Sequence, residues 1–242
     1  MIFAAGLGTR LKPLTDNMPK ALVPVEGKPL LQHTIERLSA AGFNEIIINI
    51  HHFGQQIIDF VEANNSFGIR IEFSDEREQL LDTGGGIKKA AWFFDDNRPF
   101  MIHNVDILSN IDLEEVAKQH SLNGSAATLV CSKRVTNRYL LFDNNNRLCG
   151  WINKKTGETK SPFTGFKPAN YTELAFSGIQ MMQPDMLNEM NTFADRFSTI
   201  DYYLSKCATY NITAYQPVNG CILDVGKADS LCEAAQFLNK LM

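Results

Sequence analysis

The opening segment of the chain carries glycines and cations at a spacing suited to binding phosphate. Ala4-Ala5-Gly6-Leu7-Gly8-Thr9-Arg10 follows a short apolar run, and Lys20 comes shortly afterwards, behind a proline. Glycines let backbone N–H groups approach phosphate oxygens without interference from a Cβ atom. Arginine can hold two oxygens in a planar fork, whereas lysine acts as a mobile point charge. The segment therefore predicts a phosphate-binding loop in which Arg10 and Lys20 supply the positive charge.

Two widespread phosphate motifs do not fit this loop. The dinucleotide fingerprint GxGxxG needs a third glycine where Leu11 stands, and the proline-rich stretch that follows cannot open a helix. The P-loop motif needs Gly-Lys downstream of its first glycine, and neither glycine of the segment has it. These mismatches argue against an NAD-dependent oxidoreductase and against a P-loop nucleotide hydrolase.

Two aspartates follow apolar, strand-like runs that lie far apart in the chain. Asp106 comes after Phe100–His103, and Asp224 comes after Cys221-Ile222-Leu223. Mg²⁺ prefers oxygen ligands, typically one or two carboxylates completed by phosphates and water. The ends of strands in an α/β sheet can meet at the ligand crevice, although an aspartate at a strand end also serves as a cap or turn residue. The residues by themselves leave both interpretations of Asp106 and Asp224 open, a magnesium site or a pair of cap and turn residues.

A second glycine-rich segment occurs at Leu81-Asp82-Thr83-Gly84-Gly85-Gly86. Three glycines in front of a helix allow close approach of the backbone to a flat base or a phosphate, and such a run can also be a simple loop or cap. The segment by itself leaves both interpretations open.

The pattern GxGTR-L-x-P-L-T followed by P-K-x-L-x-P-V resembles the N-terminal signature of the hexose 1-phosphate nucleotidyltransferases. Later motifs occur in the family's order, so the resemblance covers nearly the whole chain. The compact bacterial N-acetylmuramate 1-phosphate uridylyltransferases and the short mannose 1-phosphate guanylyltransferases look most similar. The resemblance implies an Mg²⁺-dependent transferase of nucleotide-sugar and cell-wall biosynthesis, which joins a nucleoside triphosphate to a sugar 1-phosphate and releases pyrophosphate.

The resemblance also implies a role for each matching residue. Arg10 and Lys20 are the catalytic cations, with Lys20 at the α-phosphorus and Arg10 on the leaving group, and Asp106 and Asp224 hold the metal. The residues expected to bind the nucleotide are Ala5, Gly6, Gly8, Thr9, Thr83, Gly84 and Gly85. The residues expected to bind the sugar phosphate are Asn104, Lys167 and Gly178. The Thr83–Gly86 segment, which lies against the base in uridylyltransferase-like members, favours UTP over GTP.

Two departures from the family pattern stand out. Val105 replaces the glycine of the usual N-G-D motif, and Phe166 replaces a glutamate before Lys167. Three other lysines compete with Lys167 for the sugar phosphate, namely Lys154, Lys155 and Lys160. Two alternatives therefore stay open: a GTP-using mannose 1-phosphate guanylyltransferase, and a regulatory relative that binds nucleotide-sugar without catalysis.

Apolar runs of strand length alternate with helix-period segments, which predicts an α/β fold. Ile46–Ile50 is a buried strand, and a helix starts near Pro29 and stops at Gly42. Short strands from about residue 126 onward, separated by polar turns, indicate a small antiparallel insert. Together with the family resemblance, these patterns predict a single Rossmann-like nucleotidyltransferase domain over 1–242, with a mixed, mostly parallel central sheet and helices on both faces. Residues 1–110 would bind the nucleotide and 111–242 the sugar phosphate.

The overall composition fits a globular enzyme. The 242 residues carry a net charge of −4 and 44% hydrophobic residues, so nothing points to nucleic acid or an anionic membrane as partner. The chain has no signal-peptide pattern and no apolar run of about 18 residues, and its five scattered cysteines match no metal motif. We expect a cytoplasmic protein with reduced thiols. Because Ile2 to Ala5 resembles the end of a strand, we also expect a few native residues upstream of Met1.

Overall fold

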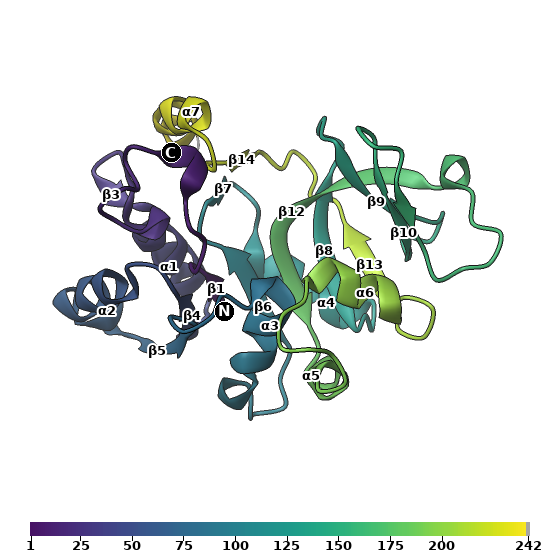
Figure 1. Ribbon diagram of the computed structural model, residues 1–242, viewed down its shortest axis with the longest axis horizontal. Coiled ribbons are helices and arrows are strands. Elements are labelled where there is room, and N and C mark those ends of the chain that lie inside the picture. Colours follow the sequence, from purple (N-terminus) through teal and green to yellow (C-terminus); the bar gives the residue numbers. More distant parts are fainter. Residues whose placement is uncertain (241–242) are drawn as a thin grey trace. The chain divides into compact units, whose positions relative to one another are not determined.

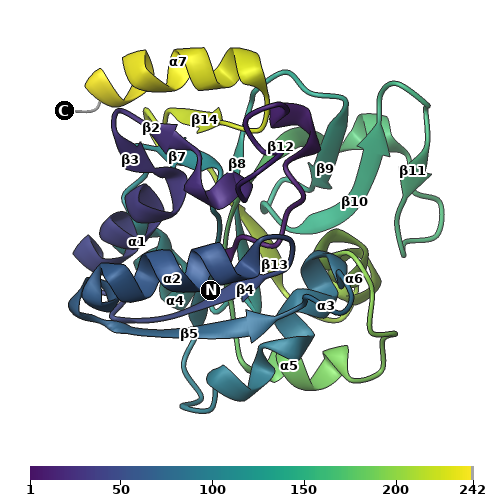
Figure 2. The same ribbon diagram turned by 60° about the vertical axis from the view of Figure 1, so that its left-hand side comes forward.

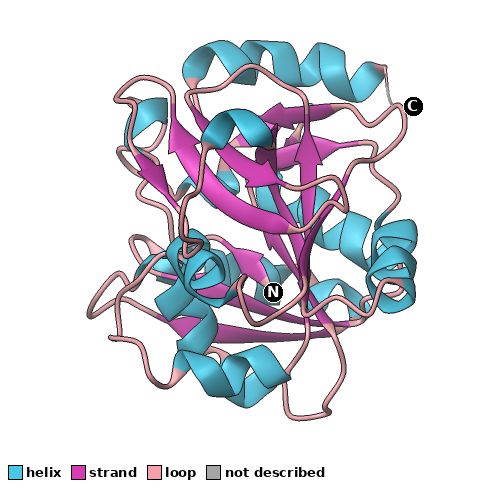
Figure 3. Ribbon diagram, turned by 90° about the vertical axis from the view of Figure 1, so that its right-hand side faces the viewer, coloured by secondary structure: helices cyan, strands magenta, loops and turns pink. Residues whose placement is uncertain are grey.

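The computed structural model describes residues 1–240, which form both helices and strands (Figure 3). The chain divides into two compact units. The first comprises Met1–Leu81, Ile102–Glu114 and the chain from Gly220 onward, and the second comprises Asp82–Met101 and Glu115–Asn219. Each unit is therefore assembled from separate stretches of sequence. The expected single domain with linear halves at 1–110 and 111–242 stays a prediction.

A parallel sheet forms the centre of the first unit. Its strands are β1 (Ile2–Phe3), β4 (Glu45–Ile50), β5 (Arg70–Asp75) and β6 (Phe100–Asn104), the last from Ile102 on. β1 pairs in parallel with both β4 and β6, and β4 pairs in parallel with β5. The predicted α/β class with a mostly parallel sheet is confirmed.

The apolar pattern of these segments explains their burial. Ile46, Ile47 and Ile48 of β4 are at most 1% exposed, as expected for a strand buried on both faces of a parallel sheet. Helix α1 (Leu30–Ala40) follows Pro29, a residue well suited to the start of a helix. Helix α2 (Gly54–Ala63) follows β4, and both helices bury one apolar stripe, as amphipathic helices do.

Two short antiparallel pairs complete the first unit. β2 (Pro24–Val25) pairs with β3 (Lys28–Pro29), and β7 (Ile107–Ser109) pairs with β14 (Ile222–Asp224). Helix α7 (Ala228–Asn239) follows β14 and is drawn in yellow beside it in Figure 2. The β7–β14 pair thus brings a late segment of the chain back to a strand that begins directly after Asp106.

The second unit contains the strands predicted for the insert and several helices (Figure 1). Its strands are β8 (Ala127–Ser132), β9 (Arg138–Phe142), β10 (Leu148–Asn153), β11 (Thr159–Lys160), β12 (Thr172–Met182) and β13 (Ile212–Tyr215). Its helices are α3 (Asp82–Lys89), most of α4 (Leu113–Leu122), α5 (Asp185–Met190) and α6 (Thr199–Lys206). Most pairs are antiparallel as predicted, but β13 joins β8 in parallel.

The glycine-rich segment near Thr83 differs from its expected form. Helix α3 already begins at Asp82, so Gly84, Gly85 and Gly86 lie inside the helix and are buried. The sequence suggested a loop before the helix, because glycine has a low intrinsic helix propensity. Tertiary packing, described below, overrides that preference.

Two further observations concern the cysteines and the helices. All five cysteines are free thiols, and Cys131, Cys149 and Cys207 are buried. Burial raises the pKa of the Cys207 thiol to about 12. Among the described residues, no helix has the length and apolar character needed to cross a membrane. The cytoplasmic location stays a prediction.

Candidate active site

The opening loop of the first unit folds tightly onto its own chain at Gly8. Gly8 has a φ of 64°, and a Cβ atom there would lie 2.9 Å from Thr15 Cγ2 and 3.2 Å from Lys20 Cβ. The Thr15 hydroxyl donates a hydrogen bond to the Gly8 carbonyl oxygen at 2.9 Å. A positive φ and the absence of a side chain are both properties of glycine. Gly8 therefore allows the loop to pack over Thr15 and Lys20.

Gly6 differs from Gly8, because a Cβ atom at Gly6 would have no heavy atom within 4 Å. Ala5, just before it, donates its backbone N–H to the Asn49 side chain at 3.2 Å. Thr9 and Arg10 lie in the short 3-10 helix η1 (Thr9–Leu11), and both are exposed. The residues assigned to the nucleotide in this loop thus include an open backbone at Gly6 and an accessible cation at Arg10.

Lys20 and Asp106 form an ion pair in the first unit, with side chains 10% and 17% exposed. Lys20 opens the 3-10 helix η2 (Lys20–Leu22), and Asp106 lies just past the end of β6. Partial burial strengthens the interaction of these charges with each other and with any ion that enters, because less water screens them. The pair places a fixed positive and a fixed negative charge at one point.

Asp224 and Arg10 reach the same point. A Cβ atom built on Gly226 would lie 2.6 Å from Asp224 Oδ1, 2.8 Å from Arg10 Nη2 and 3.3 Å from Lys20 Nζ. One small volume beside Gly226 therefore touches an acid and both cations. We call Arg10, Lys20, Asp106 and Asp224 the charged cluster.

The backbone explains why acids so distant in sequence meet. In the β7–β14 ladder, Asp224 lies opposite Ile107, the residue after Asp106. The N–H of Val225 also donates to the carbonyl oxygen of Asp106 at 2.8 Å. The two cations and the two acids thus converge in the first unit. The individual roles of the four residues stay predictions.

Val105, the departure next to Asp106, fits the structure without strain. Its side chain is 4% exposed, and its φ is not positive. Its N–H donates to the carbonyl oxygen of Phe3 at 3.1 Å, which continues the parallel pairing of β1 and β6. The larger side chain therefore points into packed protein, and the chain needs no glycine at this position.

Asn104, expected at the sugar phosphate, is the last residue of β6 and is half-buried. Its carbonyl oxygen accepts a hydrogen bond from Nδ1 of His103 at 2.8 Å. Burial lowers the pKa of His103 to about 4, so the ring is neutral at pH 7 and adds no positive charge beside the cluster.

The second glycine-rich segment packs against and hydrogen-bonds with other residues of the second unit. The N–H groups of Gly84 and Gly85 donate to the carbonyl oxygen of Phe197 at 2.9 and 3.3 Å. A Cβ atom at Gly84 would lie 2.3 Å from the Phe197 ring. The hydroxyl oxygen of Thr83 accepts from the N–H of Thr199 at 2.9 Å. These contacts explain the glycine at 84 without a nucleobase, and the predicted base contacts stay predictions.

Gly178, expected at the sugar, lies in an irregular part of β12. The β12–β8 register shifts between Phe176 and Gln180, and Gly178 has a φ of 77°. Ser177 and Gln180 flank it and are at most 2% exposed, yet Ser177 Oγ and Gln180 Oε1 have no hydrogen-bond partner among the described residues. Buried polar atoms normally have partners, so this bulge is a place where a polar ligand could be bound.

The lysines that compete for the sugar phosphate differ in their contacts. Lys154 pairs with Glu173, and Lys160 pairs with Asp201. Lys167 is exposed and has no ion-pair partner among the residues that the structure describes. Lys167 is therefore freer to bind an anion than Lys154 or Lys160.

Phe166, which stands where relatives carry a glutamate, has a packing role. Its ring stacks on Tyr171 with 4.9 Å between centroids. A Cβ atom at Gly150 would lie 2.4 Å from the Phe166 ring, so the ring lies directly against this glycine. The replacement therefore gives the loop before Lys167 an apolar anchor.

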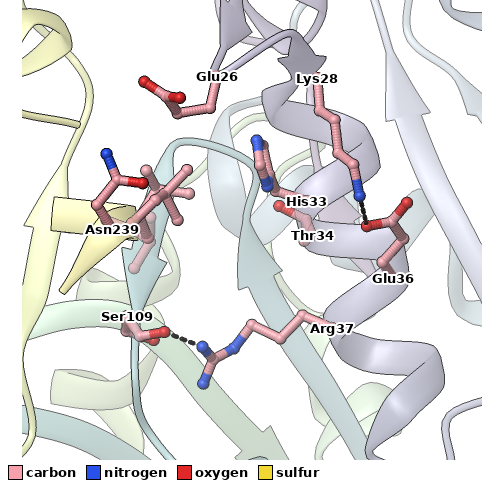
Figure 4. Close-up of a pocket in the computed structure, with 11 residues that line it drawn as sticks. Glu26, Lys28, His33, Thr34, Glu36, Arg37, Ser109 and Asn239 are labelled. Carbon is pink, nitrogen blue, oxygen red and sulfur yellow. Dashed lines mark hydrogen bonds and ion pairs between the residues drawn. The ribbon is translucent and has the colours of Figure 1, made fainter. Parts of the chain in front are cut away.

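A cavity of about 570 Å³ lies elsewhere in the first unit, among α1, β7 and the end of α7 (Figure 4). None of the four residues of the charged cluster lines it. Its cations are already engaged, since Lys28 pairs with Glu36 and the Arg37 guanidinium donates to the Ser109 carbonyl oxygen. The cavity is separate from the candidate active site.

Sequence reasoning missed two residues beside the opening loop. Asn49 and Glu76 are 3% and 0% exposed, and hydrogen bonds link them to each other and to the loop. The available signal was weak: Asn49 is the one polar residue within Ile46–Ile50. A polar interruption of a buried strand indicates a partner, but the sequence does not say which one.

The family model described as nucleotidyl transferase matches residues 1–240. N-acetylmuramate alpha-1-phosphate uridylyltransferase of Caulobacter vibrioides is 44% identical over 108 residues, which cover 44% of each chain. Mannose-1-phosphate guanyltransferase of Gibberella zeae is 38% identical over 135 residues, which cover 55% of this chain and 37% of that protein. The chain thus spans less than half the length of these two relatives.

A solved structure agrees over the whole chain. UDP-glucose pyrophosphorylase complexed with UDP-glucose superimposes with a TM-score of 0.78 at 18% identity, covering 100% of this chain and 98% of that one. This likeness shows the fold. Since the family model matches nearly every residue, the chain belongs to the nucleotidyl transferase family.

Proposed function

We propose that this protein is an Mg²⁺-dependent transferase that joins a nucleoside triphosphate, preferentially UTP, to a sugar 1-phosphate. The products are a nucleotide-sugar and pyrophosphate. The observation that carries the proposal is the charged cluster, in which Arg10, Lys20 and Asp224 border one volume beside Gly226, and Asp106 is paired with Lys20. A protein that only recognised a sugar would have no physical need for two cations and two acids at one point.

The donor set suits magnesium. Among the described residues, no group of three or more His, Cys, Asp or Glu side chains could hold a metal ion by itself. Magnesium in nucleotide enzymes commonly takes one or two carboxylates and completes its shell with phosphates and water. Asp106 and Asp224 would hold the ion, and when bound it would neutralise charge on the triphosphate.

The proposed reaction is one in-line displacement. An oxygen of the sugar phosphate attacks the α-phosphorus, the bond from that phosphorus to the bridging oxygen of the β-phosphate breaks, and pyrophosphate leaves. The attacking oxygen is already anionic, so no protein base or nucleophile is required. Lys20 stabilises the negative charge that develops at the α-phosphate, and Arg10 holds the leaving pyrophosphate.

Relatives support the choice of nucleotide and sugar. The Caulobacter protein is named for N-acetylmuramate 1-phosphate and a uridylyl group, and the Gibberella protein for mannose 1-phosphate and a guanylyl group. We favour UTP because the Thr83–Gly86 segment resembles the corresponding segment of uridylyltransferases. We favour an N-acetylmuramate-type sugar phosphate of cell-wall synthesis because the Caulobacter relative is named for that sugar.

A substrate panel tests the proposal. Pyrophosphate release would be measured with Mg²⁺ for the four common nucleoside triphosphates against muramate, glucose and mannose 1-phosphates. We expect UTP with the muramate sugar to give the largest kcat/KM. Faster turnover with GTP and mannose 1-phosphate would replace the substrate assignment. Nucleotide binding without pyrophosphate release from any pair would instead support the non-catalytic alternative.

A further inference from the structure

A buried asparagine lies at the carboxyl end of the parallel sheet. Asn49 belongs to β4, where it pairs with Phe3 of β1 on one side and with Ser74 of β5 on the other. Its side chain is 3% exposed within a strand of isoleucines. In open α/β sheets the ligand crevice lies at this end of the strands, so a polar residue here is well placed to shape it.

The asparagine holds the entry to the opening loop. Asn49 Oδ1 accepts the N–H of Ala4 at 2.7 Å and the N–H of Ala5 at 3.2 Å. These are the two residues immediately before Gly6, so their orientation sets the direction in which the glycine backbone leaves β1. The asparagine carbonyl oxygen thus takes the place of a strand partner.

A buried glutamate holds the asparagine in turn. Glu76 is 0% exposed, and its Oε1 accepts from Asn49 Nδ2 at 2.8 Å. Its other oxygen, Oε2, accepts the N–H of Leu81 at 3.0 Å. Leu81 is the residue before α3 begins. Through Asn49, the Glu76 carboxylate therefore connects the opening loop to the start of the second glycine-rich segment.

The backbone of Glu76 is also fixed. Its N–H donates to the carbonyl oxygen of Ile50 at 2.8 Å, and its carbonyl oxygen accepts from Gln79 N at 3.0 Å and from Nδ1 of His51 at 2.7 Å. Because the backbone is held and both carboxylate oxygens accept hydrogen bonds, the Glu76 side chain has little freedom to reorient. The chain of contacts from Leu81 through Glu76 and Asn49 to Ala4 is therefore stiff, which is what precise positioning of a loop requires.

We propose that Asn49 and Glu76 are positioning residues that set the geometry of the phosphate-binding loop and the residue preceding α3 through one buried hydrogen-bond chain. The inference rests on the proposed function, because it assigns that loop to the triphosphate. Both residues are buried, at 3% and 0% exposed, so we assign neither of them a direct contact with substrate. Their effect passes through the amides of Ala4 and Ala5, on one side, and of Leu81 on the other.

The direction of each hydrogen bond makes the proposal testable by exchange of polar groups. In Glu76→Gln, one carboxylate oxygen becomes an NH₂ group, which must face either Asn49 Nδ2 or the N–H of Leu81, both donors. In Asn49→Asp, a carboxylate oxygen faces the carboxylate of Glu76. In the double variant, Asp accepts from Ala4, Ala5 and the new Gln, whose carbonyl oxygen accepts from Leu81. All four hydrogen bonds are then restored, and the carboxylate charge has moved from position 76 to position 49.

The experiment compares the wild type, both single variants and the double variant at a temperature where all are folded. KM and kcat would be measured for UTP and for the sugar phosphate with Mg²⁺. Amide exchange would be followed by mass spectrometry in peptides covering Ala4–Arg10 and Leu81. Ser125→Ala serves as a matched control, because it removes a buried 2.8 Å hydrogen bond to Thr213 in the second unit.

We expect each single variant to raise KM for UTP about tenfold or more and to speed exchange at Ala4 and Ala5, since small misplacements of a binding group are costly. KM for the sugar phosphate should change less than about twofold, and the double variant should recover most of the loss. Unchanged KM for UTP in both single variants, or no recovery in the double variant, would overturn the proposal. A loss shared equally by Ser125→Ala would also overturn it.

The exchange measurement separates this inference from the proposed function. A wild type that releases no pyrophosphate contradicts the transferase assignment. Faster exchange at Ala4 and Ala5 in the single variants, restored in the double variant, would still support the positioning role. Wild-type exchange in the single variants would refute it whatever the activity.

Discussion

The opening loop around Gly6 and the first turns of α3 around Gly84 carry similar sequence signals but differ in structure. Space is open beside Gly6, whereas the position of a Cβ atom at Gly84 is filled by the ring of Phe197. Arg10 of the first loop meets Lys20 and Asp224 beside Gly226, and Lys20 pairs with Asp106. The N–H groups of Gly84 and Gly85 instead donate to a carbonyl oxygen of their own unit.

The difference shows that a glycine run has two possible causes. Glycine allows a ligand to approach the backbone, and it equally allows another part of the protein to do so. The accompanying charges distinguish the cases, because the first loop contributes Arg10 to the charged cluster, whereas Gly84 packs against an apolar ring. The predictions below test whether this contrast holds.

Removing Lys20 should have the largest effect. Lys20→Ala deletes the cation proposed for the α-phosphate and should lower kcat by about a hundredfold or more, as for other preorganised charge contacts. Pyrophosphate release measures the effect, and circular dichroism checks the fold. Lys28→Ala, which breaks the exposed pair with Glu36, is the matched control and should change kcat by less than about twofold. Near wild-type turnover by Lys20→Ala would remove Lys20 from the mechanism.

Adding a methyl group at Gly84 should mainly damage stability. Gly84→Ala places a Cβ atom 2.3 Å from the Phe197 ring, and overpacking of this kind costs about 1–3 kcal/mol. Urea unfolding should show the loss, and the double variant Gly84→Ala with Phe197→Ala should lose less than the sum of its parts. Wild-type stability of Gly84→Ala would contradict the packing role assigned to this glycine.

Gly6→Ala should leave the stability of the protein unchanged and weaken its binding of the nucleotide. Apart from Gly6 and its two chain neighbours, no heavy atom lies within 4 Å of the added methyl group, so the free energy of unfolding should stay within about 0.5 kcal/mol of the wild type. If triphosphate oxygens approach this backbone, KM for UTP should rise about tenfold, equivalent to about 1.4 kcal/mol. A stable variant with unchanged KM would show that Gly6 is not at the triphosphate.

Acid should destabilise the protein through His120 of the second unit. His120 is fully buried, and burial lowers its pKa from 6.5 to about 4. The unfolded state therefore takes up a proton first, so this contribution is present above pH 6.5 and is lost as pH falls toward 4. Between pH 6.5 and 5.5 the loss should be up to about 1 kcal/mol. Urea unfolding of His120→Gln at both values should show a smaller loss than the wild type, and an equal loss would exclude His120 as the cause.

Much of the fold was predictable because its signals are local. The isoleucines of β4 and the apolar stripe of α1 follow from residue type and spacing, and their burial confirms the pattern. The helix start at Asp82 was not predictable in this way. Glycine disfavours helix locally, and the contact with Phe197 comes from a distant segment.

The sequence by itself determined the chemistry on offer: two cations near flexible glycines, two acids after strands, and a family signature that joins them. Only the tertiary structure decided which groups meet. The register of β7 with β14 places Asp224 next to Asp106. The register of β1, β4 and β5 places Asn49 within hydrogen-bond distance of Ala4 and Glu76. Strand register and buried polar partners depend on contacts between remote segments, and no local pattern of residues records them.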